Sequence, residues 1–396
     1  MRPNDAAGRT SRRRFVARAA GLAAAAPLAA APWARLLAQT ACPGQPPGTL
    51  IRTLPLYGPG AQDAPLGRIV GGQGLDARLF TDLAGLTPER LTTPTDGVFV
   101  RTQAPPGLNL APTAWRVRLG DTGAIAAAAL AAEATPQGAH LIECAGNSNP
   151  QHFGLMSSVE WRGVPLLQAM QRLPRPERAW GVLVSGADPE VSRNERSIPG
   201  ASWILPLADI AARQPFLATG MNGGPLTPNH GAPVRLVVPG WYGCAWIKWV
   251  NALAWVGEDA PSTPQMTEYA VRTHQEGRPA LARDYQAPRI DTAAMPIRVE
   301  QRRVNGALVY DIVGIVWGGT APVDQLVIRF GSRDRGVPVR VCPAPVSAAT
   351  WALWTHRWRP AAPGYYDISL RTADPAVASR RLDLSFYIRR VRIDEV

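Results

Sequence analysis

Cysteine and histidine are the residue types in this chain that could bind a metal or attack a substrate. There are four cysteines and five histidines, namely Cys42, Cys144, Cys244, Cys342, His140, His152, His230, His274 and His356. The absence of any CxxC or CxxCH spacing excludes covalent c-type haem and a cysteine-rich zinc ribbon. The absence of HExxH or HxH spacing argues against a histidine-built metal site. A cysteine that takes part in chemistry should therefore act alone, as a thiolate ligand or as a nucleophile.

Cys144 has the most suggestive surroundings. The segment 141–147 (LIECAGN) places it at the end of a predicted strand, directly before small residues. A turn of small residues lets a bulky ligand approach both the thiolate and the backbone. A cysteine at a strand end is more often structural, so this segment alone does not establish a ligand.

Charge is unevenly distributed along the chain. The net charge is +12, and residues 1–41 carry half of it, with seven arginines against one aspartate. The rest is mildly basic and lacks the dense cationic stripe of a nucleic-acid-binding protein. Lys248 is the only lysine among 42 Lys and Arg residues. It is therefore a candidate for a specific role, with a solvated surface cation as the alternative.

The first 41 residues have the features of an export signal. The segment 11–16 (SRRRFV) precedes an alanine-rich apolar stretch over 16–34, and small residues follow between 31 and 41. An arginine pair before a phenylalanine indicates the twin-arginine route, which exports folded proteins to the periplasm. The alternative is a disordered basic tail with a helical alanine run. No other segment is apolar over about 18 residues, so we expect no membrane span.

The remaining chain divides into segments of different pattern. The length and a hydrophobic content of 46% predict two or three folded units. Residues 42–87 are expected to form an extended lead-in, and residues 258–290 a linker rich in turn formers. Residues 88–257 mix short strands with helices. The expected strands are 98–101, 115–119, 140–144, 181–185 and 234–238, and the expected helices are 166–173 and 206–213.

The pattern from 291 to 396 is strands only. Seven runs separated by turn signals cover 297–304, 308–317, 325–330, 337–341, 352–358, 365–371 and 382–392. This spacing is typical of an immunoglobulin-like sandwich. The predicted fold class is α+β: a mixed α/β domain followed by an all-β immunoglobulin-like sandwich.

Six short motifs follow one another between residues 99 and 249. They are FVR (99–101), ECAGN (143–147), WRGVPL (161–166), MNGGPL (221–226), HGAPVRLVVPG (230–240) and IKW (247–249). In this order they resemble the motifs of the sulfite oxidase family of molybdenum enzymes. GGTAPV (318–323) and the segment 351–358 are similar to the dimerisation domain of that family. The resemblance implies a molybdopterin-binding catalytic domain over 88–257 and a homodimer joined through 291–396.

The resemblance also implies roles for individual residues. Cys144 would ligate molybdenum, whose other soft ligands come from the pterin dithiolene, and Arg101 would orient the substrate anion. The cofactor would be held by Thr102, Gln103, Asp188, His230, Arg235, Trp246, Ile247 and Lys248, with the basic side chains facing its phosphate. For His230, the alternative is a histidine with satisfied hydrogen bonds at a turn before a strand.

Four positions depart from the family's sulfite oxidases. Thr102-Gln103 replace Asn-His, Ser148-Asn149 stand where an arginine follows the cysteine motif, Ala245 replaces a pocket arginine, and Pro199 replaces the active-site tyrosine. These departures predict a pocket with fewer cations and without that phenol.

The resemblance implies a periplasmic oxidoreductase that transfers an oxygen atom to sulfite or a related reduced sulfur compound. Electrons would leave to a c-type cytochrome or haem subunit, because the chain has no haem motif of its own. One alternative is a sulfane dehydrogenase-like subunit that acts on protein-bound sulfur. Another, of a different class, is a non-catalytic exported binding protein with the sandwich as a docking module.

Overall fold

A computed structural model describes residues 48–57, 66–72, 74–121, 123–147, 153–188, 201–331 and 333–396. The predicted signal peptide over 1–41 lies outside these residues, as do Cys42, Ser148-Asn149 and Pro199. No helix in the described ranges is long and apolar enough to cross a membrane.

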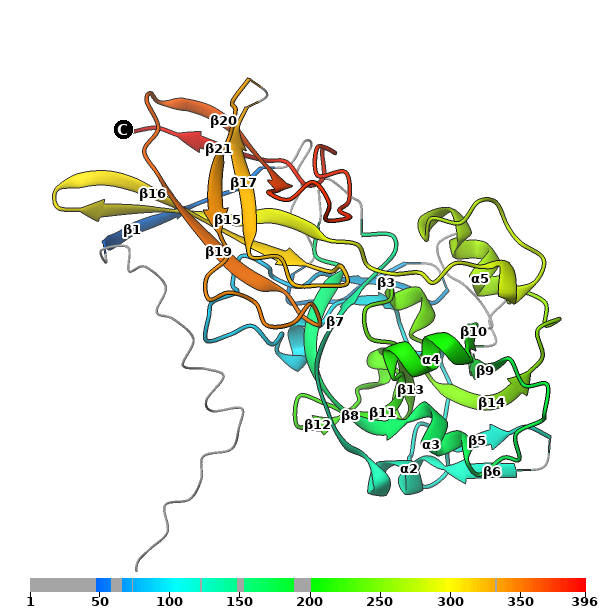
Figure 1. Cartoon of the computed structure of the whole chain (residues 1–396). Coiled ribbons are helices and arrows are strands. Elements are labelled where there is room, and N and C mark those ends of the chain that lie inside the picture. The colour runs from blue at the N-terminus through cyan, green and yellow to red at the C-terminus, as the bar shows by residue number, and fades with distance from the viewer. Residues whose placement is uncertain are drawn as a thin grey trace, which may run out of the picture. The chain divides into compact units, whose positions relative to one another are not determined.

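Three sheets build the part of the chain that carries the predicted site (Figure 1). In spatial order, the first sheet contains β10 (Ser202–Pro206), β9 (Gly181–Gly186), β14 (Val250–Val256), β5 (Arg116–Leu119) and β6 (Gly123–Ala126). The second contains β12 (Gly224–Pro225), β11 (Phe216–Met221), β8 (Met156–Pro165) and β7 (Thr135–Glu143), with β13 (Arg235–Val237) also paired to β11. The third contains β2 (Val70–Gly71), β3 (Asp76–Leu79) and β4 (Val100–Thr102).

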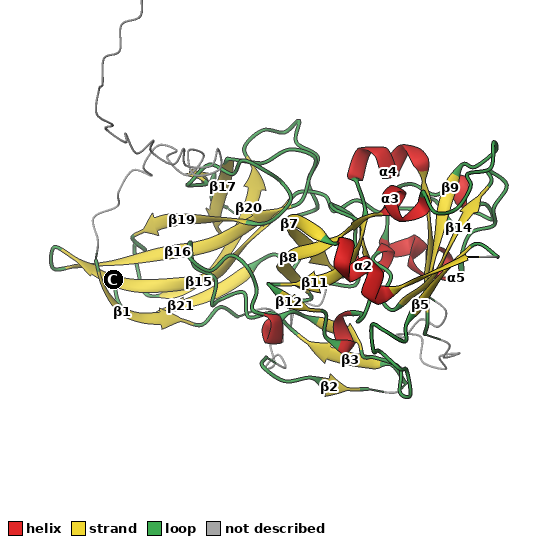
Figure 2. Ribbon diagram, turned by 90° about the horizontal axis from the view of Figure 1, so that it is seen from below, coloured by secondary structure: helices red, strands yellow, loops and turns green. Residues whose placement is uncertain are grey.

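Short helices accompany these sheets. The α-helices are α2 (Ala127–Glu133), α3 (Leu166–Met170), α4 (Leu207–Arg213) and α5 (Pro264–Tyr269). The 3-10 helices are η1 (Thr95–Gly97), η2 (Pro228–His230), η3 (Gly243–Ala245), η4 (Ala270–Arg272) and η5 (Ala282–Asp284). Helices α2 and α3 pack on β8 and β11, whereas α4 and α5 pack on β10 (Figure 2). Both helices predicted from sequence are present, although α3 ends at Met170.

Two four-stranded sheets form the sandwich, which confirms the predicted fold class. One contains β1 (Thr49–Leu54), β15 (Ala293–Val304), β16 (Ala307–Trp317) and β19 (Ala352–Trp358). The other contains β18 (Val337–Arg340), β17 (Gln325–Phe330), β20 (Gly364–Thr372) and β21 (Arg389–Ile393). Asn305 and Gly306 join β15 to β16 with φ angles of 49° and 84°, as a tight hairpin turn requires.

Three segments differ from the sequence prediction. The expected lead-in supplies β1, which pairs with β15, and β3, which pairs with β4. The expected linker contains α5, whose buried Met266 and Tyr269 anchor it to the core. The run 382–392 is a strand only from Arg389, because Phe386 and Tyr387 turn instead to stack with Phe153.

The sandwich and the α/β part share a continuous apolar core. Leu141 in β7 donates its backbone N–H to the Ala349 carbonyl at 2.7 Å, and Trp351 donates to the Leu91 carbonyl at 2.9 Å. Cys342 in the sandwich is disulfide-bonded, whereas Cys144 and Cys244 are free and buried. The strand that leads to Cys144 is therefore supported directly by the C-terminal part of the chain.

Candidate active site

The turn after β7 fixes the position of the Cys144 thiol. Cys144 donates its backbone N–H to the Leu155 carbonyl at 2.9 Å, and its carbonyl accepts from the Asn147 N–H at 2.9 Å. The Asn147 side chain accepts from the backbone of Gly154 and Leu155 at 3.3 and 3.2 Å. Gly146 directs its N–H at the Cys144 sulfur over 3.4 Å. Small residues in this turn thus leave a backbone donor beside the thiol.

Glu143, the residue before the thiol, is completely buried in an ion pair with the sandwich. Arg380 binds both of its carboxylate oxygens, at 2.9 and 2.7 Å, and Trp317 Nε1 donates to Oε2 at 2.9 Å. The Asn147 amide donates to Oε1 at 3.3 Å. Both ends of the Cys144 turn are therefore held by one carboxylate, whose charge is compensated from the sandwich.

Arg101 lies in the same pocket as the thiol and is held by a carboxylate from β3. The Asp76 carboxylate accepts hydrogen bonds from both Arg101 and Arg78. Burial raises the pKa of the Cys144 thiol, while the N–H of Gly146 and then the positive charges of Arg101, Arg272 and Arg78 act to lower it. Cationic groups therefore surround the thiol and favour its ionised form.

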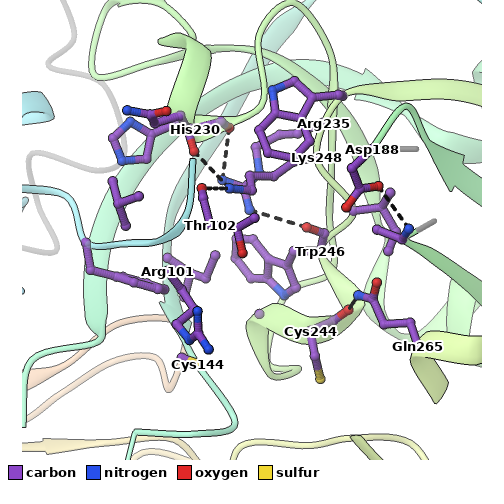
Figure 3. A pocket seen from close by; sticks show the side chains of 18 of the residues that line it. Arg101, Thr102, Cys144, Asp188, His230, Arg235, Cys244, Trp246, Lys248 and Gln265 are labelled. Carbon is purple, nitrogen blue, oxygen red and sulfur yellow. Dashed lines mark hydrogen bonds between the residues drawn. The ribbon is translucent and has the colours of Figure 1, made fainter. Parts of the chain in front are cut away.

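A single pocket contains Cys144 and nearly all of the residues predicted to bind a cofactor. Its cavity volume is about 100 Å³. Figure 3 shows Arg101 and Cys144 at one end, with Lys248, Arg235 and Asp188 at the other. The lining residues are Val98, Phe99, Val100, Arg101, Thr102, Ile142, Cys144, Asp188, Ala201, Asn229, His230, Arg235, Gly243, Cys244, Trp246, Ile247, Lys248, Trp249, Gln265 and Tyr269.

Lys248 and Arg235 bring positive charge into the interior of this pocket. Lys248 donates to the carbonyls of Thr102 and Asn229, the latter at 3.0 Å, and lies over the Trp249 ring. Arg235 is 4% exposed, and its guanidinium packs beside two indole rings, 5.2 Å from the centroid of Trp161 and 5.8 Å from that of Trp246. Its Nε is buried without a partner in the described structure. Desolvation lowers the pKa of Lys248, and it lowers the pKa of Arg235 to about 9. A bound anion would therefore strongly stabilise the charged forms of both side chains.

The glycine of the 230–240 motif allows these two cations to approach each other. Gly231 has a φ of 97°, and a Cβ there would lie 3.0 Å from Arg235 Cβ and 3.1 Å from Lys248 Cβ. Any other residue would be strained and would separate the two side chains.

His230 is neutral and fully hydrogen-bonded. Its Nε2 donates to the Val98 carbonyl at 3.1 Å, and its Nδ1 accepts from the Thr227 hydroxyl at 2.6 Å. Burial, together with Arg235 and Lys248, lowers the pKa of His230 to about 4. The ring of His230 is therefore that of a histidine with satisfied hydrogen bonds at a turn. Its backbone carbonyl accepts a hydrogen bond from Arg235 at 3.1 Å.

Asp188 is the buried acid among the cofactor-binding candidates. It accepts the Ala201 N–H at 2.9 Å, and burial raises its pKa to about 6. Lys248 lies close enough to oppose that shift. Asp188 thus places a titratable carboxyl beside the interior cations.

Comparison with known proteins agrees with the predicted molybdopterin-binding site. Residues 107–264 match the oxidoreductase molybdopterin binding domain. The chain is 29% identical to chicken (Gallus gallus) sulfite oxidase over 68% of its length and 64% of the relative's. It is 33% identical to the soybean (Glycine max) inducible NADH nitrate reductase 1 over 28% of this chain and 14% of the relative. These matches support a molybdopterin oxidoreductase of the sulfite oxidase family.

A solved structure shares the fold at low sequence identity. The sulfane dehydrogenase SoxCD from Paracoccus pantotrophus aligns with a TM-score of 0.60 and 17% identity, over 83% of this chain and 89% of that one. The matched region spans slightly less than two thirds of chicken sulfite oxidase. Family and fold are thus supported by separate comparisons.

The match to the molybdopterin binding domain and the similarity to sulfite oxidase imply a molybdenum-molybdopterin cofactor, and the pocket residues fit it. A free, buried thiol surrounded by arginines suits a soft metal that needs a thiolate ligand. The unpartnered Nε of Arg235 and the amine of Lys248 suit the cofactor's phosphate. Cys144, Arg235 and Lys248 would therefore contact opposite ends of the cofactor.

One residue predicted to bind the cofactor lies outside the pocket, and three residues that the sequence did not indicate lie at the site. Gln103 is predicted to bind the cofactor but does not line the pocket, because its side chain is exposed and donates to the Gly74 carbonyl at 3.0 Å. Tyr269 and Gln265 line the pocket from α5, in the segment expected to be a linker, and Arg78 comes from the expected lead-in. Neither segment has a periodic pattern, so only tertiary contacts reveal these residues.

Proposed function

We propose that this protein oxidises a small sulfur oxyanion such as sulfite by oxygen-atom transfer. The observation that carries the proposal is the position of Arg101, whose guanidinium, held by Asp76, lies beside the free Cys144 thiol in one pocket. A fixed cation next to the metal-binding position would attract and orient an anionic substrate. When bound, the molybdenum cofactor supplies the oxygen atom and accepts two electrons from the substrate sulfur.

The protein's own residues would bind and position the reactants. Cys144 would ligate the metal as a thiolate, and Arg235 and Lys248 would hold the phosphate in the apolar interior formed with Trp161, Trp246 and Trp249. Arg101 would hold the substrate oxygens and exclude a competing orientation. Because Asp76 also binds Arg78, the Arg101 side chain has little freedom to move away.

We further propose that electrons pass to an external c-type cytochrome or haem subunit, since the chain has no CxxCH segment. The segment 11–16 supports export to the periplasm by the twin-arginine route. The disulfide at Cys342 is in keeping with an oxidising compartment.

The second candidate is a sulfane dehydrogenase-like subunit that acts on protein-bound sulfur. It is favoured by the fold shared with SoxCD and by Ala245, which stands where the family's sulfite oxidases have a pocket arginine. Substrate binding would then be spread over a wider surface and would depend less on Arg101.

Steady-state kinetics with sulfite and cytochrome c test the proposal. We expect molybdenum-loaded wild type to oxidise sulfite, and Arg101→Gln to raise KM by about ten- to more than a hundredfold through loss of a charge-assisted contact. The exposed Arg116, replaced by Gln, is a matched control with the same change in charge. Absence of sulfite turnover in the loaded wild type would contradict the substrate assignment.

A further inference from the structure

The segment around α5 forms an ordered wall of the pocket. Thr263 caps α5 by accepting the Met266 N–H at 3.2 Å, and its hydroxyl donates to the Ser202 carbonyl at 2.6 Å. At the other end, the Thr273 hydroxyl donates to the Tyr269 carbonyl at 2.9 Å. These bonds tie both ends of the segment, so the side chains between them have defined positions.

Tyr269 presents a phenol to the same pocket as Cys144 and Arg101. The residue is 8% exposed. A tyrosine hydroxyl is neutral at physiological pH and can donate a hydrogen bond.

Arg272 adds an exposed guanidinium at the edge of this region. Its Cζ lies 5.6 Å from the centroid of the Tyr269 ring. Its Nη1 lies 3.6 Å from the point where a Cβ on Gly146 would sit, and the Cys144 sulfur lies 3.7 Å from that same point. A Cβ at Gly146 would thus be in van der Waals contact with both groups, so the guanidinium and the thiol lie near each other. Within the described ranges, no carboxylate forms an ion pair with Arg272.

We propose that Tyr269 and Arg272 recognise the substrate, with Arg272 attracting a sulfur oxyanion at the pocket entrance and the Tyr269 hydroxyl donating to one of its oxygens. The inference rests on the proposed oxidation of such an anion. It gives the pocket a phenol and a second cation from a segment where the sequence predicted only a linker. Sulfite oxidases of the family have a tyrosine at the position of Pro199 and an arginine at that of Ala245. Tyr269 and Arg272 would supply the phenol and the cation that these two positions lack.

Sulfate binding and sulfite kinetics test this inference together. The variants are Arg272→Gln and Tyr269→Phe, with Arg278→Gln as the control. Arg278 is exposed on the same segment but, unlike Arg272, is not among the cations that act on the Cys144 thiol. Each protein is compared at equal molybdenum content and equal thermal stability. The dissociation constant for sulfate is measured by calorimetry, and KM for sulfite by steady-state kinetics.

Arg272→Gln should raise both constants about three- to tenfold at low ionic strength, and less at high salt. Tyr269→Phe should raise the sulfate dissociation constant and lower kcat/KM by a similar factor. Arg278→Gln should change neither by more than about twofold. If Arg272→Gln and Tyr269→Phe match this control, or if wild type does not bind sulfate, the inference is wrong. If wild type binds sulfate but does not oxidise sulfite, the substrate assignment fails and the sulfate constants of the variants still decide the inference.

Discussion

Opposing effects act on the Cys144 thiol. Burial favours the neutral form, while a backbone donor and three guanidiniums favour the thiolate. A metal binds only the thiolate, so the cations prepare the ligand as well as attract the substrate. Cys244 lines the same pocket, but burial and the neighbouring Cys144 both raise its pKa, which keeps it protonated.

Replacing Cys144 by Ser should abolish turnover while the chain still folds. A hydroxyl is a harder and far less acidic ligand than a thiol, so the metal loses its protein ligand. Activity and circular dichroism check this, and Cys244→Ser, the equivalent change at the other free cysteine, should lose far less activity. Retention of most turnover by the Cys144→Ser protein would show that the ligand is misassigned.

Asp188 should make the cofactor-free protein less stable as the pH rises from about 4 to 6. Its pKa is raised from the usual 3.8 to about 6, so the folded state binds the proton more tightly than the unfolded state does. The stabilisation is complete below pH 4 and is lost as the pH passes 6, which amounts to about 3 kcal/mol. Denaturant unfolding of wild type and Asp188→Asn across this range checks it. The variant should show a flatter profile, and identical profiles would contradict the assignment.

Strands and helices could be predicted from the sequence where an apolar run or a proline marks them. The strand before Cys144 and the helices after Pro165 and Pro206 were predicted because apolar runs and prolines mark them. Helix α5 lies in a segment rich in turn formers and without apolar periodicity, so no local pattern distinguishes it. The pairing of β1 with β15 links residues about 250 positions apart, which no local signal encodes.

The ion pair between Glu143 and Arg380 should contribute strongly to stability because both groups are buried. Arg380→Met leaves an uncompensated carboxylate and should lower the free energy of unfolding by about 3–5 kcal/mol. Adding Glu143→Gln to that variant should restore part of the loss, since the buried charge is then removed. Urea unfolding measures both effects.

The control for this pair is Arg381→Gln, which breaks the exposed Arg381–Asp383 pair next to it. Its unfolding midpoint should stay at the wild-type value. An Arg380→Met protein as stable as this control would show that the sandwich does not hold the Cys144 turn as described.

The sequence predicts the fold class of the whole molecule, but it does not predict the contacts between the α/β part and the sandwich. Alternation of short runs predicted a sandwich, and the two four-stranded sheets confirm it. The continuous core and the Glu143–Arg380 pair depend on contacts between distant segments. Catalytic geometry and sandwich packing should therefore be lost together in one cooperative transition.

The sandwich over 291–396 is expected to pair two chains, as the dimerisation domain of the family does. Two-fold dimers are the commonest closed assembly, and exposed apolar side chains such as Val337 and Tyr365 lie on this part of the chain. Light scattering at micromolar concentration should give the mass of a dimer. A monomer mass under these conditions would contradict the expectation.

Cys144 and the interior cations are proposed to hold a molybdenum cofactor. Elemental analysis of the full chain, matured with an ample supply of molybdate and pterin, measures this. Wild type should carry one molybdenum per chain, and replacing both Arg235 and Lys248 by Gln should cause a clear loss. A folded wild-type protein that carries no molybdenum under these conditions would show that the pocket does not hold this cofactor.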